Sequence, residues 1–104
     1  YLECQKAGIR IERVEYCSNN LLNFTLRNVG KADINKLLAS VKFKDGLILN
    51  FDDIKECFKD NSLTLKSGEK KCGYLYGMNF SNAIELSVVI KDCPSVYDIA
   101  EIKC

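Results

Sequence analysis

The chain has 104 residues, the size of one domain, and 47% of them are hydrophobic, which is enough to form a core. Fifteen basic residues balance fourteen acidic ones, and the two signs are interspersed. This excludes the basic stripe of a nucleic-acid-binding domain or of a protein that adheres to anionic membranes. No apolar run is long enough to span a bilayer, so we expect a single domain over residues 1–104 that reaches a membrane only through a missing N-terminal segment.

Alternating hydrophobicity predicts β-strands from the beginning of the chain. In residues 8–16 the alternation changes phase between Ile11 and Val14, which indicates a β-bulge, and we expect Val14 and Tyr16 to face the core after it. Residues 22–27 alternate without interruption, as a strand with one buried face does. We expect their inward residues to be Leu22, Phe24 and Leu26.

Asn28-Val29-Gly30 closes this strand, since Asn and Gly tolerate the positive φ of a reversing turn. The residues that follow permit two readings. Ile34, Leu37, Leu38 and Val41 have helical spacing behind a capping Asp33, whereas residues 41–43 alternate. We expect mostly strand here.

Turn signals separate the remaining elements. Lys44-Asp45-Gly46 predicts a hairpin, residues 52–58 a short helix or a loop, and Ser67-Gly68-Glu69 a further turn. Strands are expected at residues 71–76, at 84–90 with Ile84, Leu86, Val88 and Ile90 inward, and at 97–103. Short strands separated by regular turns favour an all-β fold, an antiparallel immunoglobulin-like β-sandwich of about seven strands.

Six cysteines in so short a chain, without a CxxC pair or a histidine, indicate disulfides rather than a zinc site. They also indicate an oxidising compartment outside the cytoplasm. Six cysteines permit fifteen pairings, and the sequence does not choose among them. We expect the sequential set Cys4–Cys17, Cys57–Cys72 and Cys93–Cys104, each closing a short loop.

Two acceptor sequons for N-glycosylation occur, Asn23-Phe24-Thr25 and Asn79-Phe80-Ser81. Asn23 falls on the outward face of its strand and Asn79 in a loop, so we expect both to be reachable in an exported glycoprotein.

The search for catalytic groups is mostly negative, and we expect no enzyme and no cofactor. Without histidine, a Ser-His-Asp or Cys-His arrangement is impossible. Asp52-Asp53 is a candidate Ca²⁺ ligand pair but is more typical of a solvated loop. Glu12 and Glu15 lie near Arg10 and Arg13, which favours cross-strand charge pairs over acid–base chemistry. Tyr74 and Tyr76 share a strand face and suit either base stacking or, as we expect, core or rim packing.

The segment Asn23-Phe24-Thr25-Leu26-Arg27-Asn28-Val29-Gly30-Lys31-Ala32-Asp33-Ile34 resembles a pattern of exported archaeal β-sandwich modules. These include the head domains of archaeal type IV pilin-like and archaellin-like proteins and the CARDB-like adhesion modules. The later segment Leu63-Thr64-Leu65-Lys66-Ser67-Gly68-Glu69 is similar to a strand connection of the same families. The resemblance covers roughly residues 20 to 92.

The resemblance implies a structural domain of an extracellular archaeal pilus-like filament. Its partners would be copies of itself or other surface proteins, joined by packing or by strand exchange through residues 1–6 or 97–103. The alternative is an adhesion module of a larger cell-surface protein. Nucleic acid is not an expected partner.

Overall fold

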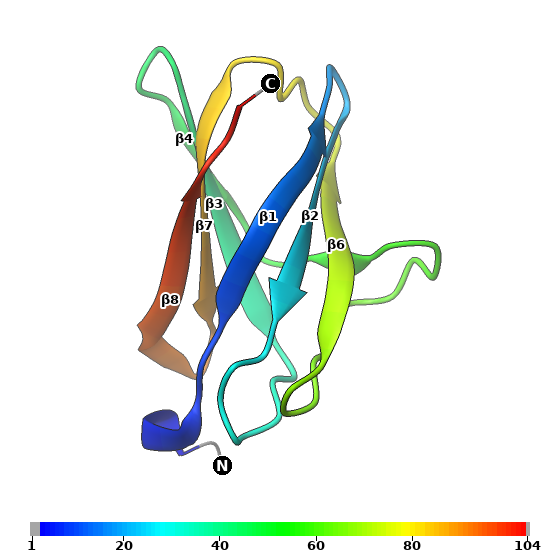
Figure 1. The fold of residues 1–104 in the computed structure, drawn as a ribbon. Coiled ribbons are helices and arrows are strands. Elements are labelled where there is room, and N and C mark those ends of the chain that lie inside the picture. Colours follow the sequence, from blue (N-terminus) through cyan, green and yellow to red (C-terminus); the bar gives the residue numbers. More distant parts are fainter. Residues whose placement is uncertain (1–2, 104) are drawn as a thin grey trace.

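The computed structural model describes residues 3–103 of the chain. These residues form eight β-strands and one short 3₁₀-helix, joined by turns and loops (Figure 1). The strands form two antiparallel four-stranded sheets, one in the order β1-β2-β6-β5 and the other in the order β4-β3-β7-β8. The elements are η1 Cys4–Lys6, β1 Arg10–Cys17, β2 Leu21–Arg27, β3 Leu37–Phe43, β4 Ile48–Phe51, β5 Lys55–Glu56, β6 Lys70–Tyr76, β7 Ala83–Ile90 and β8 Cys93–Glu101. This confirms the predicted β-sandwich, with eight strands where about seven were expected.

The alternation of the central strands builds the core between the two sheets. The inward residues of β2 are fully buried, as their spacing predicts: Leu22, Phe24 and Leu26. Inward residues of β3 and β7 meet them from the opposite sheet: Leu37, Ala39, Val41, Leu86, Val88 and Ile90. Since full burial of one such large side chain stabilises a fold by about 1.5–3 kcal/mol, these residues contribute a substantial part of the driving force for folding.

Two irregularities change which residues face the core. In β1 the register shifts after Ile11, which confirms the predicted bulge, but it shifts a second time between Val14 and Tyr16. The second shift turns Tyr16 outward, where 54% of it is exposed, so the prediction that it faces the core is wrong. In β7 the pairing with β3 is irregular near Ala83. Ala83 takes the buried position there, and Ile84, expected inward, is only half-buried.

The segments with helical spacing do not form α-helices within residues 3–103. Leu37–Phe43 forms β3, which pairs with β4 on one side and β7 on the other, so tertiary pairing overrides the local pattern. Asp33 caps no helix; its Oδ1 accepts the Ser67 N–H at 3.0 Å. Residues 52–58, expected as a short helix or loop, contain the two-residue strand β5. Among the described residues, no helix is long and apolar enough to cross a membrane.

The disulfides do not follow the sequential set. Cys57 pairs with Cys72, as expected, but Cys4 pairs with Cys93, which lies 89 residues away in the sequence. The predicted pairs of Cys4 with Cys17 and of Cys93 with Cys104 are therefore wrong. The reason is the topology: β1 and β8 are edge strands on the same side of the sandwich, so η1 reaches the turn that leads into β8 (Figure 1). Cys17 is also disulfide-bonded, and Cys104 lies outside the described residues.

Candidate functional site

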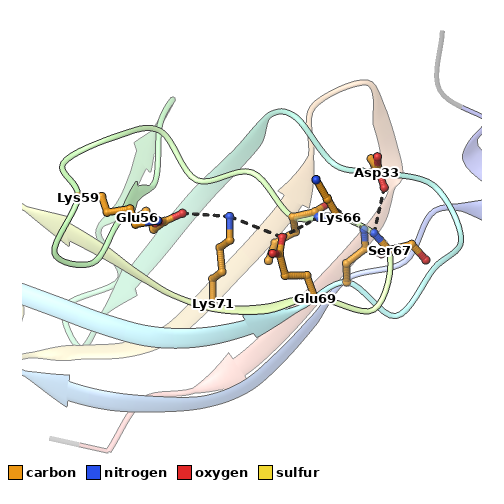
Figure 2. Close-up of polar contacts among 9 residues, drawn as sticks. Asp33, Glu56, Lys59, Lys66, Ser67, Glu69 and Lys71 are labelled. Carbon is orange, nitrogen blue, oxygen red and sulfur yellow. Dashed lines mark hydrogen bonds and ion pairs between the residues drawn. The ribbon is translucent and has the colours of Figure 1, made fainter.

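A chain of ion pairs runs along the β5–β6 edge of the first sheet (Figure 2). The Lys71 ammonium lies 3.1 Å from Glu56 and 3.5 Å from Glu69, and Lys59 lies 3.4 Å from Glu56. The hydrogen bond from Lys71 lowers the pKa of Glu56, and the same bond raises the pKa of Lys71. Because β5 has only two residues, it makes few backbone hydrogen bonds with β6, and these ion pairs add to them. The cluster therefore holds the edge strand β5 against β6, and lysine ammonium groups neutralise the carboxylates of Glu56 and Glu69.

The cluster continues into the turn after residue 65. The Glu69 carboxylate accepts the Lys66 N–H at 2.9 Å, and this hydrogen bond lowers the pKa of Glu69. Gly68 has φ +79°, which confirms the turn predicted at Ser67-Gly68-Glu69. The Ser67 hydroxyl donates to the Gly30 carbonyl at 2.7 Å. These bonds tie the β6 turn to the loop between β2 and β3.

Asn28 is the buried polar centre of that loop. Its side chain is 0% exposed, and its Nδ2 donates to the carbonyls of Ala32 at 2.8 Å and Leu65 at 3.1 Å. Its Oδ1 accepts the Gly30 N–H at 2.9 Å. Neither Asn28 nor Gly30 has a positive φ, so the predicted reason for these residues is wrong. Asn28 is required because its amide makes these three hydrogen bonds. Gly30 is required because a Cβ at this position would lie 2.4 Å from the backbone nitrogen of Gly8, which is too close for any side chain.

The other candidate polar groups are held in structural pairs. Asp53 accepts the Ser62 hydroxyl at 3.0 Å and lies 3.1 Å from Lys55 and 3.7 Å from Lys36. Burial alone would raise the pKa of Asp53, but the bonds from Ser62 and Lys55 outweigh it and lower that pKa. No group of three or more His, Cys, Asp or Glu side chains in residues 3–103 could hold a metal ion.

Charge pairing between β1 and β2 is present as expected, although with a different partner. Glu12 lies 2.6 Å from Arg27 across the two strands, and Glu15 lies 2.6 Å from Arg13 on its own strand. The hydrogen bond from Arg27 lowers the pKa of Glu12. These pairs are exposed and contribute little to stability.

The two sequon asparagines differ in accessibility. Asn79 is exposed in the β6–β7 loop, where its Oδ1 accepts the Ser81 N–H at 2.9 Å and the Ser81 hydroxyl. Asn23 is half-buried in β2, which is paired on both sides. Its Oδ1 is buried without a hydrogen-bond partner among the described residues.

Tyr74 and Tyr76 lie on the outer face of the first sheet, with ring centroids 5.8 Å apart. They therefore share a strand face and pack at the rim rather than in the core. The Tyr74 hydroxyl donates to Asp60 Oδ1 at 2.5 Å, and this bond raises the pKa of Tyr74. The sequence did not predict the pocket beside Tyr74. One wall of this pocket is the sheet and the other is the loop between β5 and β6, and only the folded structure brings the two together.

The second sheet carries an apolar patch on its outer face. Tyr97 and Ile99 of β8 are 56% and 50% exposed. The register places Val89 beside Tyr97 and Leu38 beside Val89 across three strands. We name these four residues the β8 patch. On the same face, two rows beyond the row of Tyr97, the side chains are charged. Lys42, Glu85 and Glu101 lie side by side there across β3, β7 and β8.

No protein-family model and no curated protein sequence matches this chain. Among solved structures, the fold is similar to a chain of the archaellum periplasmic stator protein complex FlaF and FlaG from Sulfolobus acidocaldarius. That match has a TM-score of 0.63 and 16% identity, over 91% of this chain and 88% of that chain. The archaellum periplasmic stator protein FlaG from the same organism matches with a TM-score of 0.60 and 16% identity, over 92% of this chain and 99% of that one. At this identity the likeness shows the fold alone.

Proposed function

We propose that this chain is a structural domain of an archaeal surface-filament machinery that works outside the cytoplasm without catalysis. The observation that carries the proposal is the fold, which nearly the whole chain shares with two solved periplasmic stator structures of the archaellum. The disulfides Cys4–Cys93 and Cys57–Cys72 support an extracytoplasmic location, because such bonds persist in oxidising compartments.

In this proposal the domain assembles by packing the β8 patch of one copy against that of another. Tyr97 and Ile99 give the patch an apolar centre, and apolar area removed from water drives association. The nearby charged row holds both signs, Lys42 beside Glu85 and Glu101. A two-fold axis can therefore set the lysine of one copy against a glutamate of the other, so the face is complementary to itself.

Packing has more support in the structure than strand exchange. Cys4–Lys6 forms η1 and is tied to Cys93 by the disulfide, and residues 97–101 pair with β7 of their own sheet. Ile102 is buried, and its N–H donates to the Ile84 carbonyl at 2.8 Å. Both candidate exchange segments would have to detach from their own domain before pairing with another.

Glycosylation belongs to the same proposal, with Asn79 as the acceptor. Asn79 is exposed in a loop, whereas Asn23 is half-buried within a strand that is paired on both sides. Mass spectrometry of tryptic peptides from the protein of its native cells tests this. We expect glycan on the Asn79 peptide and none on the Asn23 peptide, and the reverse pattern would contradict the assignment.

The function is tested by deleting the gene and inspecting the cells by electron microscopy and motility assays. We expect surface filaments to be lost or non-functional, and the intact gene to restore them. A gene carrying Tyr97→Glu should not restore them, whereas one carrying Leu47→Glu, an apolar residue of similar exposure in the β3–β4 turn, should. Normal filaments and normal motility in the deletion strain would overturn the proposal.

The assembly step has its own test in the purified domain. Sedimentation equilibrium should show a concentration-dependent dimer of the wild-type chain. Tyr97→Glu should remove the dimer, and Tyr16→Glu should leave it. A wild-type monomer at every soluble concentration would refute packing through the β8 patch.

A further inference from the structure

A pocket of about 420 Å³ opens on the outer face of the first sheet, opposite the β8 patch. The sheet register places Tyr16, Asn23, Tyr74 and Lys55 side by side across β1, β2, β6 and β5. Asn23 and Tyr74 line the pocket, and Phe58 and Asp60 of the β5–β6 loop line its other side. A concave site of this size with apolar walls and a few polar groups is typical of ligand sites.

The loop that forms this pocket is held in a strained and exposed shape. Phe58 and Asp60 have φ values of 69° and 60°, which non-glycine residues rarely adopt. The Cys57–Cys72 disulfide and the bond from Cys57 N–H to the Cys72 carbonyl at 3.0 Å anchor the loop to β6. The Phe58 side chain is fully exposed. Strain that displays an apolar ring to solvent stabilises nothing within this chain, and such strain clusters at binding sites.

The carboxylate of Asp60 gives the pocket an acceptor that has room for further donors. Within residues 3–103 Asp60 makes no ion pair, and its carboxylate accepts one hydrogen bond, from Tyr74. The nearby Lys59 ammonium is already paired with Glu56 at 3.4 Å.

We propose that this pocket binds an arginine side chain presented by a protein partner. A guanidinium group has five N–H donors, no acceptor and a positive charge, which matches a pocket whose Asp60 carboxylate makes no ion pair within residues 3–103. It is flat and stacks on aromatic faces such as those of Tyr74 and Phe58, where a cation is also attracted by the ring electrons. A sugar hydroxyl can also donate to Asp60, but it is neutral and forms no ion pair with the carboxylate. This inference does not depend on assembly through the β8 patch.

The test is a titration of the ¹⁵N-labelled, oxidised domain with the peptide acetyl-Gly-Arg-Gly-amide, followed by NMR. We expect saturable chemical-shift changes at residues 57–60 and at Tyr74. The dissociation constant should be about 1 mM, because the peptide is held by a single side chain. The peptide with citrulline in place of arginine has the same shape without the charge. It should bind at least about tenfold more weakly, which corresponds to ~1.4 kcal/mol.

Two matched variants complete the design. Asp60→Asn keeps an acceptor for Tyr74 and tolerates a positive φ, so the loop is retained, and we expect it to weaken arginine binding about tenfold. Asp45→Asn removes the same charge in the distant β3–β4 turn and should leave binding unchanged. Equal binding of the arginine and citrulline peptides, binding of methyl glycosides instead, or no saturable shift with any probe would each overturn the proposal.

Discussion

Replacing Asn28 by alanine should destabilise the domain by about 3 kcal/mol. The substitution removes three hydrogen bonds, those to the Ala32 and Leu65 carbonyls and that from the Gly30 N–H, and each is worth about 1 kcal/mol. Since Asn28 is fully buried, water cannot replace them without opening the loop. A loss of this size is large for a domain whose total stability is about 5–15 kcal/mol.

Urea unfolding followed by circular dichroism measures the change. With an m-value of about 1–3 kcal/mol/M, a loss of about 3 kcal/mol should lower the midpoint by roughly 1–3 M while m stays constant. Asn35→Ala, in an exposed position of the same loop, is the control and should change stability by less than about 0.5 kcal/mol. A cost below about 1 kcal/mol for Asn28→Ala would refute the claim that this amide organises the loop.

Asn28→Asp sharpens the test, because it keeps the oxygen that accepts from Gly30 but replaces the donor by a carboxylate oxygen. That oxygen faces two carbonyls, so at pH 7 this variant should be less stable than Asn28→Ala. Burial raises the pKa of the introduced carboxyl in the folded state, so the cost is present above its unfolded pKa and is relieved as the pH falls. A variant at least as stable as Asn28→Ala at pH 7 would contradict the geometry.

The remaining predictions concern backbone packing, disulfides and charge. Gly30→Ala should lower the melting temperature more than Gly68→Ala, because its Cβ would meet backbone atoms at 2.4 Å whereas Gly68 faces open space; equal melting temperatures would contradict this. Removing the Cys4–Cys93 bond should cost about 4–5 kcal/mol and removing Cys57–Cys72 about 3 kcal/mol, because the first closes the longer loop. Calorimetry of the two double variants measures both losses, and the opposite order would refute the assignment. Lys71 lowers the pKa of Glu56 from its usual 4.5, so this carboxylate adds stability above pH 4.5 that is lost as the pH falls through the lowered value. Urea midpoints of Glu56→Gln should therefore decline less between pH 5 and pH 3 than those of the wild type, and parallel curves would count against the ion pair.

Local alternation was enough to predict the central strands. Residues 22–27 alternate strictly because β2 has one face on the core, and a period of two has no competing explanation there. Residues 34–41 satisfied a helical period as well, and only the pairing of β3 with β4 and β7 decides between the two. Ile84 was misplaced because an irregularity in pairing leaves no trace in the sequence of its own strand.

The disulfides and the pocket depend on the arrangement of the sheets, which the sequence does not specify locally. Cys4 reaches Cys93 because the edge strands β1 and β8 lie on the same side of the sandwich (Figure 1). The Tyr74–Tyr76 spacing did predict a shared face, but the second wall of the pocket comes from a strained loop. The fold imposes the positive φ of Phe58, since an aromatic residue does not signal it, whereas Asp60 is a residue type that tolerates positive φ.

Cross-linking in intact cells tests the proposed assembly most directly. The full-length protein carrying Ile99→Cys, in the organism that encodes it, is treated with a short membrane-impermeant bifunctional maleimide and examined on a gel. We predict a band at twice the protein's mass for Ile99→Cys and none for Asn19→Cys, an exposed position in the β1–β2 turn. A dimer would place the domain outside the cytoplasm with its β8 patch against a second copy. A monomer for Ile99→Cys, or equal cross-linking of both variants, would contradict the account.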